Sequence, residues 1–240
     1  MREVYIGTAG WSIPTFTASS FPSEGSHLQR YAAILNCVEI NSTFYRPHRL
    51  PTWTRWAAST PANFRFSIKL PRAITHDSGL ICEREQLLPF LEQLRPLGPR
   101  LGPLLIQLPP SQAFDPLRAP VFLETVRSEH PNGPIAVEPR HITWFSSEAD
   151  QVLRDLRIAR VVADPPKDPE PLAPGGDRSL LYIRLHGSPR MYYSSYDAAF
   201  LEQIASLIQT TPSTTAWCIF DNTAHGHAAA NALDLSQMLK

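Results

Sequence analysis

The chain of 240 residues has few cysteines and no excess of charge of either sign. Its three cysteines, Cys37, Cys82 and Cys218, lie far apart and form no C-x-x-C pair, which argues against a disulfide-stapled secreted domain. We therefore expect a reduced, cytoplasmic protein. Because 22 Lys and Arg residues balance 22 Asp and Glu residues, the field of the whole molecule does not attract nucleic acid.

Long apolar runs and the common nucleotide and hydrolase motifs are also missing. No run is long enough to span a bilayer, and Val4–Gly7 already has the pattern of a strand. We therefore expect a soluble protein with no membrane partner and no leader peptide. The chain has no G-x-x-x-x-G-K-[ST], G-x-G-x-x-G, H-E-x-x-H or G-x-S-x-G pattern, which disfavours P-loop, Rossmann, zincin and hydrolase-elbow enzymes.

Short apolar strands alternate with helical stretches along the whole chain. The expected strands are Val4–Gly7, Cys37–Asn41, Phe64–Lys69, Leu104–Leu108, Ile135–Glu138, Val161–Asp164, Leu181–His186 and Trp217–Asp221. The expected helices are Ser26–Leu35, Pro51–Ser59, Glu83–Leu97, Pro116–Glu129, Ser146–Leu156, Ser195–Gln209 and Ala224–Met238. Pro165–Asp177 is rich in proline and glycine and is expected to be a loop. This alternation predicts one domain, residues 1–240, folded as an α/β (β/α)₈ TIM-like barrel, with a doubly wound open sheet as the alternative.

Polar residues alternate with apolar ones in several expected strands. Parallel strands that are covered on both faces are normally almost all apolar. Here Glu39 alternates with Val38 and Ile40. The polar sides of the second, third, fifth and seventh strands carry Glu39, Asn41, Arg65, Ser67, Lys69, Glu138, Tyr182, Arg184 and His186. Successive side chains point to opposite faces and helices cover the apolar face, so the polar set should point into the barrel.

A polar lumen is either a charge-balanced structural network or a wet functional pocket, because each unpaired enclosed polar group costs roughly 2–7 kcal/mol. For the deeper residues Glu39, Arg65 and Arg184 both interpretations stay open. Active sites of barrels lie at the C-terminal ends of the strands. This position favours function for Lys69, Gln107, Glu138, Arg140, Asp164, His186 and Asp221. We expect six of these side chains to converge on one pocket, namely those of Glu39, Lys69, Glu138, Asp164, Arg184 and His186.

Two chemistries suit these residues. Glu39, Glu138, Asp164 and Asp221 could hold a divalent metal together with His186, but no paired histidine spacing accompanies them, so no cofactor is expected. In the metal-free alternative, Glu138 or Asp164 is the general acid or base, and Lys69, Arg140 or Arg184 stabilises an anionic group. A Schiff base on Lys69 is disfavoured because nearby carboxylates should keep its charge.

Aromatic residues and one glycine–arginine segment occupy the expected loops that follow the strands. The aromatic residues are Trp11, Phe44, Tyr45, Trp144, Tyr192, Tyr193 and Tyr196, which either stack on a sugar or base or cap the barrel. Gly187 and Arg190 follow the seventh strand, where barrels often bind phosphate. Gly187 allows close backbone approach and Arg190 offers a charged fork, unless Arg190 is only a solvated loop charge.

A series of ordered motifs carries a family resemblance. The motifs are Ile6–Trp11, Val38–Tyr45, Phe66–Lys69, Thr75-His76, Leu105–Pro110, Val137–His141, Ala163-Asp164, Ile183–Gly187, Phe220–Thr223 and Asn231-Ala232. Together they resemble the YecE-like family, domain of unknown function seventy-two, over nearly the whole chain. The chain departs from the family pattern at Ala9, where serine is usual, and at Pro139, where a bulkier apolar residue is usual.

The resemblance implies a TIM barrel and no particular reaction, since sugar-isomerase-like and nucleic-acid roles rest on fold analogy. It implies functional positions at Glu39, Asn41, Tyr45, Lys69, Gln107, Glu138, Arg140, His141, Asp164, Arg184, His186 and Asn222. We expect an enzyme that acts on a small polar or anionic, sugar- or phosphate-bearing metabolite. The alternatives are a nucleic-acid-binding or nucleic-acid-processing barrel and a non-catalytic small-molecule binding protein.

These expectations divide the site residues into two groups. The expected catalytic residues are Glu138, Asp164, Lys69 and His186. The expected substrate-binding residues are Glu39, Asn41, Tyr45, Gln107, Arg140, His141, Arg184, Gly187, Arg190, Tyr192, Asn222 and Trp11. The oligomeric state is left open.

Overall fold

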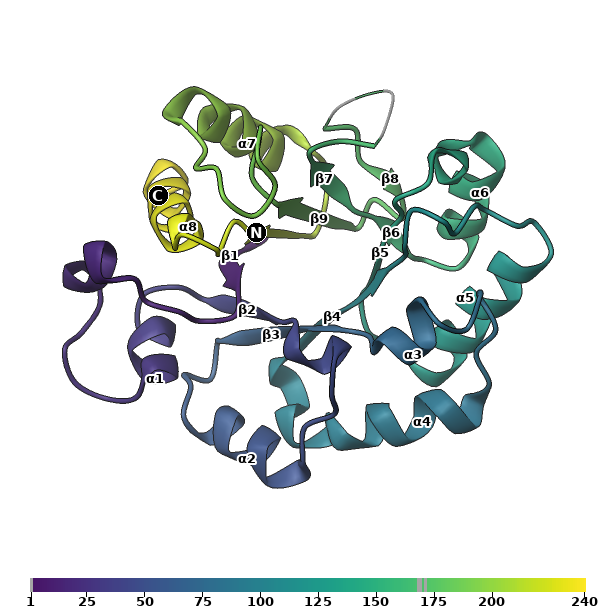
Figure 1. Cartoon of the computed structure of the whole chain (residues 1–240), viewed down its shortest axis with the longest axis horizontal. Coiled ribbons are helices and arrows are strands. Elements are labelled where there is room, and N and C mark those ends of the chain that lie inside the picture. The colour runs from purple at the N-terminus through teal and green to yellow at the C-terminus, as the bar shows by residue number, and fades with distance from the viewer. Residues whose placement is uncertain (1, 168–169, 171) are drawn as a thin grey trace.

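The computed structural model describes residues 2–167, 170 and 172–240, and shows a ring of mainly parallel strands surrounded by helices (Figure 1). The strands are β1 (Glu3–Ala9), β2 (Cys37–Ile40), β3 (Arg65–Lys69), β4 (Leu101–Gln107), β5 (Ile135–Glu138), β6 (Ala159–Arg160), β7 (Val162–Asp164), β8 (Gly175–Gly176), β9 (Leu180–Leu185) and β10 (Thr215–Phe220). Their order β7-β9-β10-β1-β2-β3-β4-β5-β6-β8 confirms the α/β barrel expected from the sequence.

The sixth expected strand, Val161–Asp164, began too late, because the extended segment at this place starts at Ala159 and is interrupted at Val161. Its first half, β6, pairs in parallel with β5, and its second half, β7, pairs in parallel with β9. At the break the Val161 N–H donates to the Val137 carbonyl oxygen at 2.8 Å. One extended segment therefore joins the strands on both of its sides, which leaves no long open edge.

The helices are α1 (His27–Ala32), α2 (Leu50–Ala58), α3 (Arg72–Thr75), α4 (Arg84–Gln93), α5 (Arg118–Glu129), α6 (Ser147–Asp155), α7 (Ala198–Thr210) and α8 (His227–Met238). Among the described residues, none of these helices is long and apolar enough to cross a membrane. The expected helix 83–97 was too long, because α4 ends at Gln93 and a 3₁₀ segment, Arg95–Arg100, with two prolines follows. The four-residue α3 was missed, since it is too short for a periodic pattern.

Two helices begin later than expected, and the loop between the sixth and seventh expected strands contains a short strand. The starts at 195 and 224 were too early: the Asp197 side chain caps α7, and α8 starts after Gly226 in the left-handed conformation. The expected loop 165–177 contains the short β8, which pairs antiparallel with β6, and no helix in its described part. Asp168, Pro169 and Pro171 lie outside the described residues.

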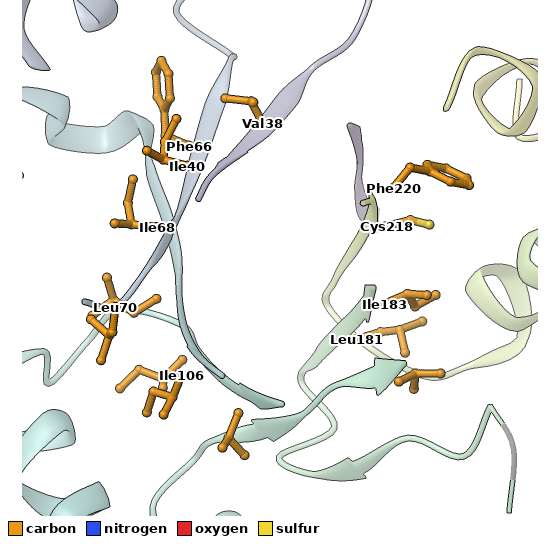
Figure 2. Packing of buried hydrophobic residues seen from close by; sticks show 14 of the residues in the cluster. Val38, Ile40, Phe66, Ile68, Leu70, Ile106, Leu181, Ile183, Cys218 and Phe220 are labelled. Carbon is orange, nitrogen blue, oxygen red and sulfur yellow. The ribbon is translucent and has the colours of Figure 1, made fainter. Parts of the chain in front are cut away.

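The alternation of side chains divides the buried residues into an outer and an inner core. The outer core packs the sheet against the helices, and Figure 2 shows its side chains, among them Val38, Ile68 and Ile183, pointing outward from the ring of strands. The inner core fills the lower lumen and includes Tyr5, Tyr182 and Trp217. The Trp217 ring centroid lies 4.7 Å from that of Tyr5 and 6.1 Å from that of Tyr182. The lower lumen is thus plugged by aromatic rings, and the polar residues lie above this plug.

Candidate functional site

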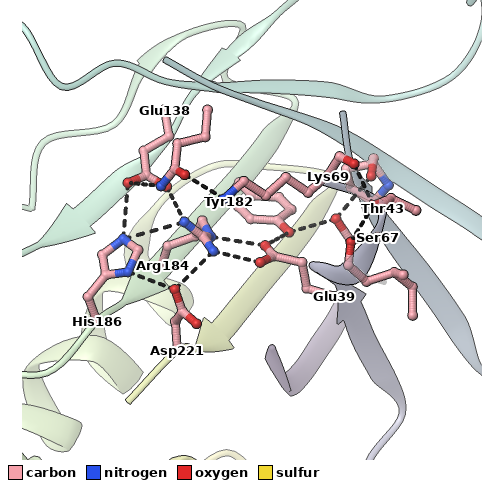
Figure 3. A network of polar contacts seen from close by, with 12 residues as sticks. Glu39, Thr43, Ser67, Lys69, Glu138, Tyr182, Arg184, His186 and Asp221 are labelled. Atoms are coloured by element: carbon pink, nitrogen blue, oxygen red, sulfur yellow. Dashed lines mark hydrogen bonds and ion pairs between the residues drawn. The ribbon is translucent and has the colours of Figure 1, made fainter. Parts of the chain in front are cut away.

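Arg184, on β9, lies at the centre of the polar lumen and is fully buried (Figure 3). It binds Glu39 with two hydrogen bonds, from Nε to Oε2 at 2.9 Å and from Nη2 to Oε1 at 2.6 Å. It also donates from Nη1 to Glu138 Oε2 and from Nη2 to Asp221 Oδ2, the latter at 3.2 Å. Three carboxylates from three strands or strand ends therefore share one guanidinium. Burial works against its charge, but these carboxylates outweigh it and hold the pKa of Arg184 well above its usual value.

Two neutral hydroxyls complete the bottom of this network. The Tyr182 hydroxyl donates to Glu39 Oε2 at 2.8 Å, and the Ser67 hydroxyl lies 2.7 Å from the Tyr182 hydroxyl. Burial raises the pKa of Tyr182 well above its usual value, so this hydroxyl stays a donor. We call Glu39, Ser67, Tyr182 and Arg184 the lower layer; all four side chains are sealed from solvent. Glu39 and Arg184 thus belong to one buried ion-pair network, whereas the Arg65 side chain donates to the Ala62 and Phe64 carbonyl oxygens.

Above the lower layer, His186 lies between two carboxylates. Its Nδ1 is 3.0 Å from Asp221 Oδ2 and its Nε2 is 3.0 Å from Glu138 Oε1. Burial disfavours the imidazolium, but Glu138 and the hydrogen bonds to both carboxylates outweigh it, so the pKa of His186 is raised. Arg140 approaches the same nitrogen, with Nη2 at 3.1 Å from His186 Nε2, and donates from Nε to Glu138 Oε1 at 2.7 Å.

Glu138 spans both levels of the site. Besides Arg184, His186 and Arg140, Gln107 donates to it from Nε2 at 3.3 Å. Burial opposes ionisation, yet Arg184, His186 and Arg140 together hold the pKa of Glu138 well below its usual value. Asp221 behaves in the same way, since Arg184 and His186 outweigh burial and lower its pKa. Both groups therefore stay ionised and position the cations around them.

Of the three described cations Lys69, Arg140 and Arg184 in the lumen, Lys69 has the fewest hydrogen-bond partners. Its Nζ donates to the neutral Gln107 Oε1 at 2.5 Å and lies 4.2 Å from the centroid of the Phe44 ring. None of the ion pairs among residues 2–167, 170 and 172–240 includes Lys69. Burial and the charge of Arg184 outweigh Glu39, Glu138 and Asp221 and lower the pKa of Lys69 to about 8. Carboxylates were expected to keep the charge of this lysine, and with a pKa of about 8 it is still mostly protonated at pH 7, although burial lowers the pKa. We call Lys69, Gln107, Arg140, His186 and Asp221 the upper layer.

Asp164 does not join the site, and its expected convergence was wrong. In β7, Asp164 pairs with Leu185 and Ala163 pairs with Arg184, so Ala163 faces the lumen and Asp164 faces outward. There Asp164 Oδ2 accepts a hydrogen bond from the Tyr196 hydroxyl at 2.7 Å. The remaining residues do converge. Glu39, Glu138, Arg184 and His186 are joined by direct contacts, and Lys69 is joined to Glu138 through Gln107.

The loop after β9 does not form the expected phosphate cradle. The Gly187 N–H donates to the Tyr196 hydroxyl at 2.7 Å and is not free for a ligand. Gly187 has a φ of +94°, and a Cβ there would lie 2.9 Å from the Ser194 carbonyl oxygen, so glycine is required for the turn. Arg190 is exposed and stacks on Tyr193, with its guanidinium carbon 3.9 Å from the ring centroid. This geometry matches a solvated loop charge.

Other expected binding residues lie at the rim or hold loops. Tyr45 is 81% exposed and Tyr192 41% exposed. Trp11 packs edge-on against Trp56, with ring centroids 5.0 Å apart. His141 accepts from the Thr143 N–H at 3.3 Å and caps a 3₁₀ turn.

The two asparagines among the expected binding residues lie in different surroundings. Asn222 is buried and donates to the Ser194 carbonyl oxygen at 2.9 Å and to Asn231 Oδ1 at 3.0 Å, so it fixes loops. Asn41 follows β2 beside the site and is half-buried.

Two residues at the mouth lie outside the expected catalytic and substrate-binding residues, although the sequence pointed to Phe44 as a stacking or capping ring. Phe44 covers Lys69, and His76 packs edge-on against Phe44 with ring centroids 4.8 Å apart. The Thr75-His76 pair stood out as a motif, but nothing in its spacing indicated contact with a residue on another element. The described His, Cys, Asp and Glu residues include no group of three or more that could hold a metal ion. Both carboxylate oxygens of Glu39 and one each of Glu138 and Asp221 are bound to Arg184.

The comparisons with known proteins agree on one family. Residues 5–240 match the family model "Protein of unknown function DUF72". UPF0759 protein YecE of Escherichia coli strain K12 is 34% identical over 169 residues, 67% of this chain and 59% of YecE. UPF0759 protein YunF of Bacillus subtilis strain 168 is 28% identical over 204 residues, 77% of this chain and 70% of YunF. The chain thus spans less than two thirds of YecE.

Among solved structures, a DUF72 family protein from Thermotoga maritima superposes with a TM-score of 0.84 at 27% identity, covering 99% of both chains. A DUF72 family protein from Enterococcus faecalis also reaches 0.84, at 21% identity, covering 98% of this chain and 95% of that one. The likeness to the Enterococcus faecalis protein shows a shared fold.

Proposed function

Since the chain belongs to the DUF72 family, we propose a function from the chemistry of its own site: an enzyme that binds a small anionic metabolite between Lys69 and Arg140 and catalyses a proton transfer on it. The single observation that carries this proposal is that Lys69 is largely buried, yet its hydrogen-bond partner is the neutral amide of Gln107. A buried ammonium without a counter-ion is costly. A bound carboxylate or phosphate would remove that cost by supplying the missing charge.

The charge balance of the site supports an anionic ligand. The two layers contain equal numbers of negative and positive side chains. The three carboxylates are Glu39, Glu138 and Asp221, and the three cations are Lys69, Arg140 and Arg184. The raised pKa of His186 favours the imidazolium, whose charge would add to an otherwise balanced set. The surplus charge favours a ligand of the opposite sign.

Arg140 provides the second half of the anion site. Its Nε is bound to Glu138, whereas its Nη1 has only a weak 4.0 Å contact with the Met191 sulfur. A guanidinium with an open edge binds carboxylate or phosphate oxygens well. Lys69 and Arg140 thus offer donors from strand ends on two sides of Gln107.

Lys69 suits proton transfer because a pKa of about 8 lies close to neutral pH. At pH 7 it is mostly protonated and can donate to a substrate oxygen. The sealed Glu138 keeps its negative charge and orients Arg140 and His186. These roles replace the expected general acid–base pair of Glu138 and Asp164.

The test is anion binding by the purified chain. Thermal shift and calorimetry with phosphate, sulfate, small carboxylates and sugar phosphates should show binding at pH 7 that weakens as pH rises through 8, because Lys69 loses its charge. Lys69→Met should weaken binding at least about tenfold. The control Lys240→Met, at an exposed lysine, should leave it unchanged.

Oligonucleotide binding at two salt concentrations distinguishes the nucleic-acid alternative. Salt-sensitive binding that depends on Arg190 and Tyr192, with no bound anion, would overturn the proposal. Binding of an anion with no turnover across the panel would instead favour the non-catalytic binding protein.

A further inference from the structure

His76 stands at the mouth of the site, directly after the short helix α3 that follows β3. Its ring packs edge-on against Phe44, with centroids 4.8 Å apart. The same Phe44 ring lies under the Lys69 ammonium, at 4.2 Å from Nζ to the centroid. One aromatic ring therefore contacts both the imidazole and the ammonium that lacks a counter-ion.

A contact with the Thr75 hydroxyl favours one tautomer of His76. The Thr75 hydroxyl donates to the Pro71 carbonyl oxygen at 3.2 Å, and its oxygen lies 2.9 Å from His76 Nδ1. The hydroxyl has a single hydrogen, so its bond to Pro71 favours the tautomer that carries the ring hydrogen on Nδ1. Nε2 then keeps its lone pair, and it has no hydrogen-bond partner among the described residues.

The charges around His76 favour the neutral imidazole. Burial lowers its pKa, and the positive charges of Lys69, Arg72 and Arg140 lower it further, against the opposing effect of Asp77. Both Lys69 and Arg140 belong to the anion site proposed above. The imidazole is therefore within electrostatic reach of a ligand bound there.

We propose that His76 is a catalytic residue that contacts the bound metabolite and accepts a proton from it at Nε2. This inference rests on the proposed function, because Lys69 and Arg140 must hold the metabolite. In the step, a new Nε2–H bond forms as an O–H or C–H bond next to the anionic group breaks. The electron pair of the broken bond stays on the substrate, where the Lys69 ammonium stabilises the negative charge. The imidazolium later returns the proton.

The test is a pH titration of the histidine rings by ¹⁵N and ¹H NMR, with and without inorganic phosphate or sulfate. A bound anion should raise the pKa of His76 by about one unit, because a negative charge nearby favours the imidazolium. The nitrogen shifts of the neutral form should show the hydrogen on Nδ1. His48 is the internal control: it is also partly buried against aromatic rings and its pKa is also lowered, by burial and Arg46. Its pKa should not change with the anion.

The outcomes separate this inference from the proposed function. Lys69-dependent anion binding with an unchanged His76 pKa, or with the hydrogen on Nε2, overturns the role of His76 alone. If neither phosphate nor sulfate binds, the anion site and the role of His76 both fail. A rise for His76 that equals the change for His48 reflects a general ionic effect and also overturns the inference.

Discussion

The lower and upper layers of the lumen use the same residue types in opposite ways. In the lower layer, Arg184 is fully buried and bound to carboxylates on several of its nitrogens. In the upper layer, Lys69 is 9% exposed and bound to an amide. A cation that is sealed with its counter-ions stabilises the fold, whereas a cation near solvent without one is available for a ligand. Depth in the barrel therefore separates an ion-paired guanidinium from an ammonium that lacks a counter-ion.

The largest expected effect comes from breaking the lower layer. Arg184→Met keeps most of the packing volume but leaves buried carboxylates without their partner, so it should cost about 3–5 kcal/mol of unfolding free energy. Adding Glu39→Gln should recover part of that loss. Urea unfolding measures both, with the exposed Arg190→Met as the control, whose cost should stay within about 0.5 kcal/mol. A loss from Arg184→Met no larger than that of the control would remove the distinction between the layers.

Replacing Lys69 in the upper layer should instead raise the unfolding free energy. The pKa of Lys69 is lowered from 10.5 to about 8 in the folded chain, so folding penalises the charged lysine. The penalty is fully present below pH 8 and disappears as pH rises from 8 to 10.5, because there the unfolded chain binds more protons. This lowering of the Lys69 pKa corresponds to roughly 3 kcal/mol of unfolding free energy.

Lys69→Met should therefore be more stable than the unchanged chain at pH 7. Its advantage should shrink between pH 8 and 10.5, as followed by urea unfolding across that range. Tyrosine ionisation affects both chains equally and cancels in the difference. A variant that is less stable at pH 7 would mean that Lys69 already has a good counter-ion.

The sequence could predict much of this site because side-chain alternation reveals which strand positions face the lumen. Glu39, Lys69, Glu138 and Arg184 alternate with apolar neighbours, and the structure brings them together. Asp164 failed because residues 158–163 are almost all apolar apart from Arg160, so the strand offers no clear alternation to show its facing. Its position near a strand end was then misleading.

Contacts between distant loops were beyond the same reasoning. The hydroxyl of Tyr196 occupies the Gly187 N–H, and the packing of His76 on Phe44 joins the loops after two different strands. Neither contact leaves a periodic pattern in the chain. The pKa of Lys69 also depends on how far its ammonium lies from the carboxylates, which the spacing along the chain does not give. The carboxylates are near enough to affect this pKa, but the hydrogen-bond partner of Lys69 is Gln107.

The smallest expected effect tests the outward position of Asp164. Asp164→Asn keeps an oxygen that can accept from the Tyr196 hydroxyl, so it should cost only about 1 kcal/mol of unfolding free energy. Because the side chain lies outside the lumen, anion affinity should change less than about twofold, against at least about tenfold for Lys69→Met. Calorimetry with the same anion on both variants provides the comparison. Tyr196→Phe serves as the matched change on the other partner, and it should cost more because the Gly187 N–H also loses its acceptor. Equal losses of anion affinity in Asp164→Asn and Lys69→Met would place Asp164 in the binding site, and the separation of the ligand-binding layer from the structural contacts around it would then be wrong.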